Sequence, residues 1–292
     1  MHGTSDTPDS WSRLAEELSG MSIPGAVYII GAGDSGKSTF AAYLCRRLTA
    51  EGRTAEYVDL DPGQSRFGPP TTVGLARWHR GGPPELEALR FVGSTSPPGT
   101  LLQHAAAASA LRRRNAGLRF TIIDACGFVQ GPMAEKFQYN LIDILRPEII
   151  VRLGSAGGPR RSSASFIHAP GMTVHQLPVS DAAAATSAEE RRRNRLRSYA
   201  EYFRGARQDE IPLRSAALHG KVPDLSPGST AGGLLVGFCD AEQWLLALGI
   251  VSSVDPGGNL RYVAPPFPRE KTAALQFGSL RLIPENGHLL ER

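Results

Sequence analysis

A glycine-rich stretch near the start of the chain has the residue types and spacing of a phosphate-binding loop. It reads GAGDSGKS from Gly31 to Ser38, the pattern G-x-x-x-x-G-K-S, between an apolar run at residues 27–30 and a run of good helix formers. Its glycines let backbone N–H groups turn towards an anion, and the following helix directs its positive end to the same place. We therefore expect a nucleoside triphosphate here rather than a ligand-free turn, with Lys37 at the β- and γ-phosphates and Ser38 on Mg²⁺. The expected nucleotide-binding residues are Gly33, Asp34, Ser35, Gly36, Lys37, Ser38 and Thr39.

Two carboxylates follow the next expected strand, at residues 55–60. Asp59 and Asp61 are two residues apart, so they share a face if the strand continues as far as Asp61. One carboxylate could hold Mg²⁺ through water, and the other could accept the proton of an attacking hydroxyl. The alternative is an Asp-Pro-Gly turn that only closes the strand.

A third carboxylate ends the run LRFTIID at residues 118–124, which is typical of a buried central strand. Asp124 begins the pattern D-x-x-G, which Gly127 completes. In many P-loop proteins such an Asp is the partner of Mg²⁺ and the Gly responds to the γ-phosphate, although a simple strand-end cap is the alternative. The carboxyl ends of parallel strands lie at one edge of a sheet, so Asp124 is expected close to Lys37.

A hydroxyl-rich turn precedes an alanine-rich stretch that is expected to form a helix over about 100–115. Ser94 and Thr95 lie in this turn, within GSTSPPG at residues 93–99. Their hydroxyls could donate to a phosphate or to the 5′ end of a substrate. A plain helix cap is an equal alternative.

A cationic helix is expected over residues 182–205. Its sequence EERRRNRLR at residues 189–197 places Arg191 and Arg195 on one face and Arg193 and Arg197 on another. A helix with so many guanidinium groups is costly unless it meets an anion. A lid that closes over phosphates would use one or two of them against transition-state charge, and a solvated basic face is the alternative.

The order of strands and helices predicts an α/β P-loop NTPase with a mostly parallel, doubly wound sheet. Three parts are expected: an N-terminal extension over 1–24, with an amphipathic piece at residues 11–18, a P-loop domain over 25–210 that includes the lid helix, and a small β-rich module over 211–292. Further strands are expected at residues 27–30, 89–92, 148–153, 166–168 and 173–177, helices at 37–50 and 132–145, and short β runs in the module at 234–238, 244–251, 260–263, 274–277 and 280–282.

Composition excludes several classes of protein. The chain has 292 residues, 41% of them hydrophobic, and no run approaches the roughly 18–20 apolar residues of a membrane span. The N-terminus lacks the pattern of a secretory signal. Three widely spaced cysteines fit neither a disulfide framework nor a zinc cluster, so we expect reduced thiols in a cytoplasm. Arginine runs at residues 112–114, 160–161 and 191–197 suggest a polyanionic partner.

Five segments in the same order resemble the polynucleotide 5′-hydroxyl kinases of the RNA-processing type. These segments are the loop at 31–39, YVDLDPGQ at 57–64, FVGSTSP at 91–97, DACGFVQG at 124–131, and the arginine helix that ends in Tyr202-Phe203. ALGIV at 247–251 is similar to the family's C-terminal β module. The resemblance covers nearly the whole chain and is closest to a compact prokaryotic form. It implies Mg²⁺-dependent transfer of the ATP γ-phosphate to the 5′-hydroxyl of RNA, with DNA as a second possible substrate.

The resemblance also implies roles for single residues. Asp61 would activate the 5′-hydroxyl, with Asp59 and Gln64 positioning metal and substrate, and Arg191 and Arg195 match the R-x-x-x-R of the lid. The remaining residues expected to bind substrate are Ser94, Thr95, Gly127, Phe128, Arg193 and Arg197, and those expected to hold metal are Ser38, Asp61 and Asp124.

Two positions depart from the family's pattern. The clasp motif, usually T-x-G-W, reads Ala125-Cys126-Gly127-Phe128, so the base-stacking aromatic is a smaller ring and one hydroxyl is missing. Asp124 stands where the family more often has an amide. This favours its role as the Mg²⁺ partner and leaves open whether Asp61 or Asp124 is the main ligand.

Two other functions stay open. A P-loop switch ATPase that acts with a protein partner would also use Asp124 and Gly127, whereas the absence of an N-K-x-D motif argues against a GTPase. A nucleic-acid-binding scaffold that has lost its kinase activity is the other, against which the intact Lys37, Ser38 and Asp61 weigh.

Overall fold

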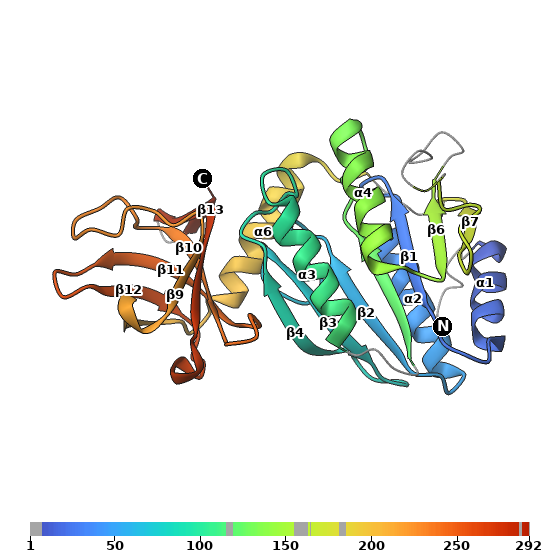
Figure 1. Cartoon of the computed structure of the whole chain (residues 1–292), viewed down its shortest axis with the longest axis horizontal. Coiled ribbons are helices and arrows are strands. Elements are labelled where there is room, and N and C mark those ends of the chain that lie inside the picture. Colours follow the sequence, from blue (N-terminus) through green and yellow to red (C-terminus); the bar gives the residue numbers. More distant parts are fainter. Residues whose placement is uncertain are drawn as a thin grey trace. The chain divides into compact units, whose positions relative to one another are not determined.

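The computed structural model describes residues 8–114, 119–154, 163, 165–180, 185–285 and 288–291. The chain forms two compact units and passes between them more than once. Unit 1 consists of Met1–Asp61, Gly74–Glu87 and Leu101–Thr186, and unit 2 of Pro62–Val73, Ala88–Thr100 and Ser187–Arg292. Each unit contains a β-sheet (Figure 1).

The sheet of the P-loop region has the strand order β4-β3-β2-β5-β1-β6-β7. The pairs from β2 to β7 are parallel, and β2 pairs with β3 in the antiparallel sense. The strands are β1 (Ala26–Gly31), β2 (Ala55–Leu60), β3 (Thr72–Trp78), β4 (Glu85–Phe91), β5 (Phe120–Ala125), β6 (Ile149–Leu153) and β7 (Thr173–Leu177). The central strands β1, β2 and β5 are buried along their whole length, so the mostly parallel α/β sheet is confirmed.

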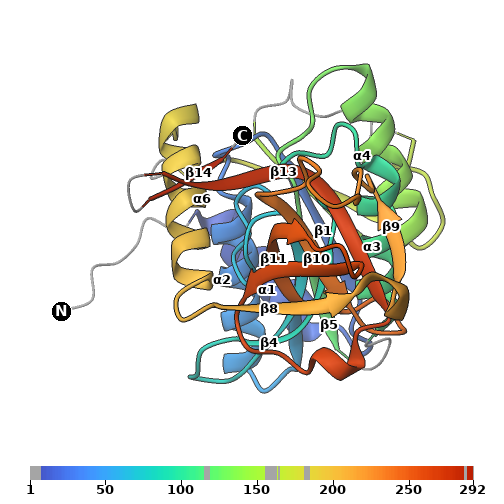
Figure 2. The same cartoon turned by 90° about the vertical axis from the view of Figure 1, so that its left-hand side faces the viewer.

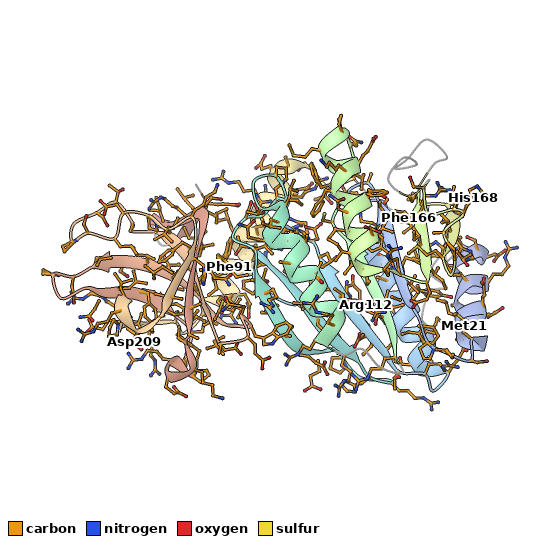
Figure 3. All side chains as sticks on the ribbon, viewed as in Figure 1. Met21, Phe91, Arg112, Phe166, His168 and Asp209 are labelled. Atoms are coloured by element: carbon orange, nitrogen blue, oxygen red, sulfur yellow. The ribbon has the colours of Figure 1, made fainter. Side chains whose placement is uncertain are left out.

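Within the described residues, four helices accompany this sheet: α1 (Asp9–Gly20), α2 (Lys37–Ala50), α3 (Leu101–Arg114) and α4 (Pro132–Leu145). Figure 1 shows α3 and α4 side by side in front of the sheet, and Figure 3 labels Arg112 on α3. The amphipathic piece at 11–18 is confirmed as part of α1. Its Trp11 is buried and its ring lies 4.7 Å from that of Phe40 on α2, measured between ring centroids.

Two expectations about unit 1 were incomplete or wrong. Strand β3 was not predicted, because Gly74 and Arg77 obscure its apolar pattern and two prolines precede it. The strand expected at 166–168 is wrong, because residues 165–168 form a turn. Phe166, labelled in Figure 3, is buried in that turn, and its ring lies 5.1 Å from that of Tyr139 on α4. A large apolar ring here marks packing of a turn rather than a strand.

Unit 2 contains helix α6 and an antiparallel sheet of strand order β14-β13-β10-β11-β12-β8. Strand β9 adds to β13 in the parallel sense. The elements are α6 (Ala188–Tyr202), β8 (Arg207–Pro212), β9 (Ala217–Gly220), β10 (Leu234–Cys239), β11 (Leu245–Val254), β12 (Asn259–Ala264), β13 (Ala274–Glu285) and β14 (His288–Glu291), with short 3₁₀ turns at Leu213–Ser215 and Arg269–Lys271. The two runs expected at 274–277 and 280–282 are one strand, and β8, β9 and β14 were not predicted.

Helix α6 groups with the β-rich unit, whereas a boundary at residue 210 would leave it in the P-loop domain. The reason is its apolar side: the buried Tyr199 packs with Phe91, Leu235, Leu248 and Leu282. Figure 2, which faces unit 2, shows α6 beside β14. The helix begins at Ala188, and the part expected at 182–184 lies outside the described residues, as does the arginine pair at 160–161.

The segment at 88–100 is held in unit 2 by close contacts with glycines. A Cβ on Gly237 would lie 2.9 Å from the Phe91 ring, so only glycine lets this ring lie against β10.

On β8, Asp209 (labelled in Figure 3) accepts a hydrogen bond of 2.7 Å from Arg269. All three cysteines are buried, and none of them forms a disulfide. Among the described residues, no helix combines the length and apolarity needed to cross a membrane.

Candidate active site

The loop between β1 and α2 has the conformation that its sequence predicts. Gly36 adopts a φ of 81° directly before Lys37, the first residue of α2, and such a left-handed conformation favours glycine. Asp34 adopts a φ of 60°, which is uncommon for a residue with a side chain. Helix α2 therefore begins directly after the loop that follows β1, and the first backbone N–H groups of a helix can bind an anion.

Lys37 is 7% exposed although it carries a charge. Its Nζ donates a hydrogen bond of 2.7 Å to the carbonyl oxygen of Ala32, within the same loop. Across the described ranges of the chain, Lys37 forms no ion pair within 4 Å. No described carboxylate is in direct contact with the ammonium, although Asp124 lies within electrostatic range, and an anion that enters the loop would stabilise the buried charge further.

Asp124, on β5, lies next to Asp59 of β2 and Ile29 of β1 across the parallel strands. Its Oδ2 accepts hydrogen bonds from the Ser38 hydroxyl at 2.6 Å and from the Tyr57 hydroxyl at 2.7 Å. Its Oδ1 is buried and has no hydrogen-bond partner in the described part of the chain. Burial raises the pKa of Asp124, while Lys37, Ser38 and Tyr57 act in the opposite direction.

These contacts fit a Mg²⁺ ion. A hydroxyl and a carboxylate meet at one point, and the buried Oδ1 of Asp124 is an acceptor without a donor. No group of three or more His, Cys, Asp or Glu side chains that could hold a metal occurs within the described ranges. Mg²⁺ is usually bound by one or two carboxylates together with phosphates and water, so Ser38 and Asp124 would be the protein's part of such a site.

Asp59 and Asp61 have different environments. Asp59 is 1% exposed, and its Oδ1 accepts the backbone N–H of Asp61 at 3.0 Å. This contact closes the turn after β2 and fixes the direction in which the chain leaves the sheet. Asp61 is half-buried, and its charge contributes to the raised pKa of both Asp124 and Cys126. Asp61 therefore lies close enough to Asp124 and Cys126 to interact with both electrostatically.

The clasp segment, Cys126–Phe128, packs against the P-loop. A Cβ on Gly127 would lie 3.0 Å from both Cα and N of Gly33, so a side chain there would push the two loops apart. Cys126 is buried, and burial raises the pKa of its thiol to about 12, so it is protonated and unreactive at neutral pH. Phe128 is half-buried, with its ring 6.2 Å from that of Phe137 on α4.

The P-loop is also connected to the residue that precedes α6 in the sequence. The Oδ2 of Asp34 accepts a hydrogen bond of 2.8 Å from the backbone N–H of Thr186. Ser187 follows as the N-cap of α6 and forms a capping box with Glu190. Asp34 thus holds the backbone of Thr186 within unit 1, a role that its place in the motif did not indicate.

The predicted residues of unit 2 make mostly internal contacts. The Gln64 amide donates to the carbonyl oxygen of Gly63 at 2.8 Å and, over 3.4 Å, to that of Arg191. Ser94 donates to the carbonyl oxygen of Ser96 at 2.9 Å and accepts the N–H of the same residue. This local turn favours the structural alternative for Ser94.

The lid arginines differ in their partners. Arg195 Nε donates to both carboxylate oxygens of Glu291, at 3.1 and 2.9 Å, and the two side chains are only 19% and 9% exposed. Thr95 donates to the same carboxylate over 3.5 Å. Arg193 forms an exposed ion pair with Glu189 at 3.1 Å.

Several residues that form hydrogen bonds with the predicted site residues were not themselves predicted as part of the site, chiefly Tyr57, Gln138, Thr186 and Glu291. Tyr57 alone carried a signal, because it lies two residues before Asp59 and so points to the same side of β2. The other three depend on contacts between distant parts of the chain.

Comparisons with known proteins agree with this geometry. A polyribonucleotide 5′-hydroxyl-kinase of Thermococcus kodakarensis is 30% identical over 225 residues, which cover 74% of this chain and 62% of that protein. One from Pyrococcus horikoshii is 28% identical over 211 residues, 70% of this chain and 56% of that protein. The chain thus spans about three fifths of the length of these curated relatives.

A solved wild-type Clp1p–Pcf11p complex contains a chain of similar fold. Its TM-score is 0.72 at 16% identity, over 95% of this chain and 80% of that one. The family described as mRNA cleavage and polyadenylation factor CLP1 P-loop matches residues 31–205, which is more than half of the sequence. The loop at 31–38, Asp124 and α6 all lie within this match, and the chain therefore belongs to the CLP1 P-loop family.

Proposed function

We propose that this chain is an ATP-dependent polynucleotide 5′-hydroxyl kinase, which transfers the γ-phosphate to the 5′-hydroxyl end of RNA and, as a second substrate, of DNA. The observation that carries the proposal is the meeting of Ser38 with Asp124, one of whose oxygens is buried without a donor, in the neighbourhood of Asp61. The names of the curated relatives support the choice of substrate.

The P-loop residues would bind and orient the triphosphate. Lys37 would exchange its contact with the Ala32 carbonyl for the β- and γ-phosphates, which remain close to the same loop. Ser38 and Asp124 would hold Mg²⁺, which when bound neutralises charge that develops on the phosphate oxygens. Tyr57 would keep the Asp124 carboxylate in place through its own hydrogen bond.

Asp61 would accept the proton of the attacking 5′-hydroxyl. Its half-buried position after the turn leaves the carboxylate partly accessible, whereas Asp59 is buried and engaged with the backbone of Asp61. Asp59 would therefore be a positioning residue, and Asp61 the general base. We propose this division for the two roles, general base and positioning residue, that the sequence leaves open for Asp59 and Asp61.

In unit 1, the clasp segment would hold the strand. Phe128 would stack on the terminal base, because an aromatic face binds any base without sequence preference. Arg191 would contact the transferring phosphoryl group, and Arg195 could do so only after it leaves Glu291. The other proposed substrate contacts are Gln64, Ser94, Thr95, Gly127, Arg193 and Arg197.

A labelling experiment tests the proposal. The protein is incubated with Mg²⁺, γ-labelled ATP and matched RNA and DNA oligonucleotides that carry a 5′-hydroxyl or a 5′-phosphate. Label on the 5′-hydroxyl strands alone is the expected result, and the ratio of RNA to DNA labelling defines the substrate class. The matched control is Lys37→Ala, which should label neither strand. Equal labelling of 5′-phosphorylated strands would contradict the proposal.

One observation favours a second candidate, a switch ATPase. Gly127 lies against Gly33 closely enough for movement of one loop to displace the other, as a γ-phosphate sensor requires. The two functions differ in their products. A switch ATPase would release free phosphate without any strand and would respond to a protein partner.

A further inference from the structure

A buried amide lies behind the clasp segment, on the apolar side of α4. Gln138 is 0% exposed and shares that side with buried residues such as Phe137 and Leu141. A glutamine at such a position is costly unless both ends of its amide are hydrogen-bonded. In this protein both ends are.

The partners of Gln138 determine how its amide is oriented. Its Nε2 donates to the carbonyl oxygen of Phe128 at 2.9 Å and lies 3.4 Å from that of Cys126. Both of these partners are acceptors, so the amino group must face them, and Oε1 must accept from the Tyr28 hydroxyl at 2.6 Å. Burial raises the pKa of Tyr28 further, so its hydroxyl remains a donor.

These hydrogen bonds fix the clasp segment at a second place, in addition to its contact with the P-loop. Gly127 lies against Gly33, and the neighbouring carbonyls of Cys126 and Phe128 are bound to Gln138. The backbone from which the Phe128 ring projects is therefore held at two points. Loss of one of them would let the ring turn without disturbing the P-loop itself.

The ring of Phe128 is supported in the same layer. Phe137 lies 6.2 Å from it, and His104 of α3 meets Phe137 edge to face at 5.2 Å. His104 is fully buried, and burial lowers its pKa to about 4, so the ring is neutral at neutral pH and packs as an aromatic group. The helix side behind the clasp thus holds the Phe128 backbone through Gln138 and its ring through Phe137.

We propose that Gln138 is a positioning residue for the nucleic-acid strand: through the Phe128 carbonyl it sets the angle at which the Phe128 ring receives the terminal base. This inference rests on the proposed function, because it takes Phe128 as the platform for that base. Gln138 does not touch the nucleotide site, so its effect should fall on the strand and not on ATP.

The test measures strand binding without chemistry. A 5′-hydroxyl oligonucleotide with 2-aminopurine as its first base is titrated into the full chain in the absence of ATP, and stacking is followed as fluorescence quenching. Gln138→Leu removes both hydrogen-bonding ends at similar size. We expect an affinity about tenfold weaker, with reduced quenching at saturation, from the loss of two or three buried hydrogen bonds.

Two further measurements separate positioning from a general loss of structure. Affinity for a fluorescent ATP analogue should stay within about twofold of the wild type, and in the kinase assay the KM for the strand should rise while the KM for ATP does not. Tyr28→Phe is the milder variant if Gln138→Leu folds poorly. It removes only the donor to Oε1, and we expect a weakening of about threefold.

The outcomes are distinguishable. Equal losses of strand and nucleotide affinity in both variants, or wild-type quenching in Gln138→Leu, would overturn the positioning role. Phe128→Leu is the reference variant, and it should abolish the quenching. If Phe128→Leu abolishes it and Gln138→Leu does not, only the inference about Gln138 fails. If Phe128→Leu leaves the quenching intact, the stacking platform of the proposed function fails as well.

Discussion

The P-loop region and helix α6 both concentrate charge, but they neutralise it differently. In the P-loop region, Lys37 and Asp124 are buried, and neither forms an ion pair with a described residue, although each has neutral hydrogen-bond partners. In α6, Arg195 is paired with the nearly buried Glu291, and Arg193 with Glu189. In the P-loop region the two charges can therefore still interact with a ligand, whereas in α6 at least two arginines form ion pairs within unit 2.

This difference shows that a cluster of arginines in a sequence does not by itself indicate which of them can bind a ligand. From the sequence, Arg191 and Arg195 are equivalent, since both lie on one face of the helix. In the structure, Arg195 holds β14 against α6 through Glu291, so its first role is in unit 2 itself. A pair that is removed from water and hydrogen-bonded resists exchange with another anion.

Among the variants of the buried and paired charges in these two regions, Lys37→Ala should have the largest effect, a loss of kinase activity of about 100- to 1,000-fold. The lysine is the buried cation that the phosphates would neutralise, and alanine removes it without adding bulk. The measurement is the initial rate of strand labelling, with the circular dichroism spectrum as a control for folding. Activity within tenfold of the wild type would contradict this prediction, because the charge of Lys37 would then not be needed at the phosphates.

Asp124→Asn should change the metal dependence. The amide oxygen can still accept from Ser38 and Tyr57, but the negative charge that faces Mg²⁺ is lost. We expect the Mg²⁺ concentration for half-maximal activity to rise at least about tenfold. A titration of labelling rate against Mg²⁺ measures this, and an unchanged midpoint would make Asp61 the main ligand.

Glu291→Gln should act on stability. It leaves Arg195 partly buried without its carboxylate, and we expect the free energy of unfolding to fall by about 1–3 kcal/mol. Urea denaturation measures the change, and a double-mutant cycle with Arg195→Gln isolates the pair. An interaction energy near zero would mean that Arg195 is as available for phosphate as Arg191.

Arg193→Gln should have the smallest effect on the free energy of unfolding. Its pair with Glu189 is exposed and lies one turn away on the same helix, where such pairs contribute only about 0.3–0.5 kcal/mol. Urea denaturation should therefore show a shift of at most this size, which salt suppresses. A loss as large as that of Glu291→Gln would remove the distinction between the two arginines.

The sequence predicts what is local. The P-loop, the strand that ends in Asp124 and the turn after Asp59 are each encoded in fewer than ten consecutive residues, and all were placed correctly on the sheet. Strand β3 was missed because a Gly and an Arg interrupt its pattern, and residues 166–168 were misassigned because a short apolar run describes a packed turn equally well.

The partners of the site residues could not be predicted in the same way. Gln138 appears in the sequence as one polar residue in an amphipathic helix, and only the fold brings it to the Phe128 carbonyl. Glu291 lies 96 positions from Arg195, and nothing in either neighbourhood indicates their pairing. Such contacts depend on how distant segments pack, which residue types and spacing do not record.

The most direct test of the central claim is a single-turnover measurement with γ-labelled ATP and a 5′-hydroxyl RNA strand, on the wild type and on Asp61→Asn. Label in the strand and label in free phosphate are counted together over time. The account predicts that the wild type transfers label to the strand, and that Asp61→Asn binds ATP normally but transfers it about 100- to 10,000-fold more slowly. Wild-type release of free phosphate at the same rate with and without the strand would contradict the proposed transfer to a 5′-hydroxyl and make the protein a P-loop ATPase.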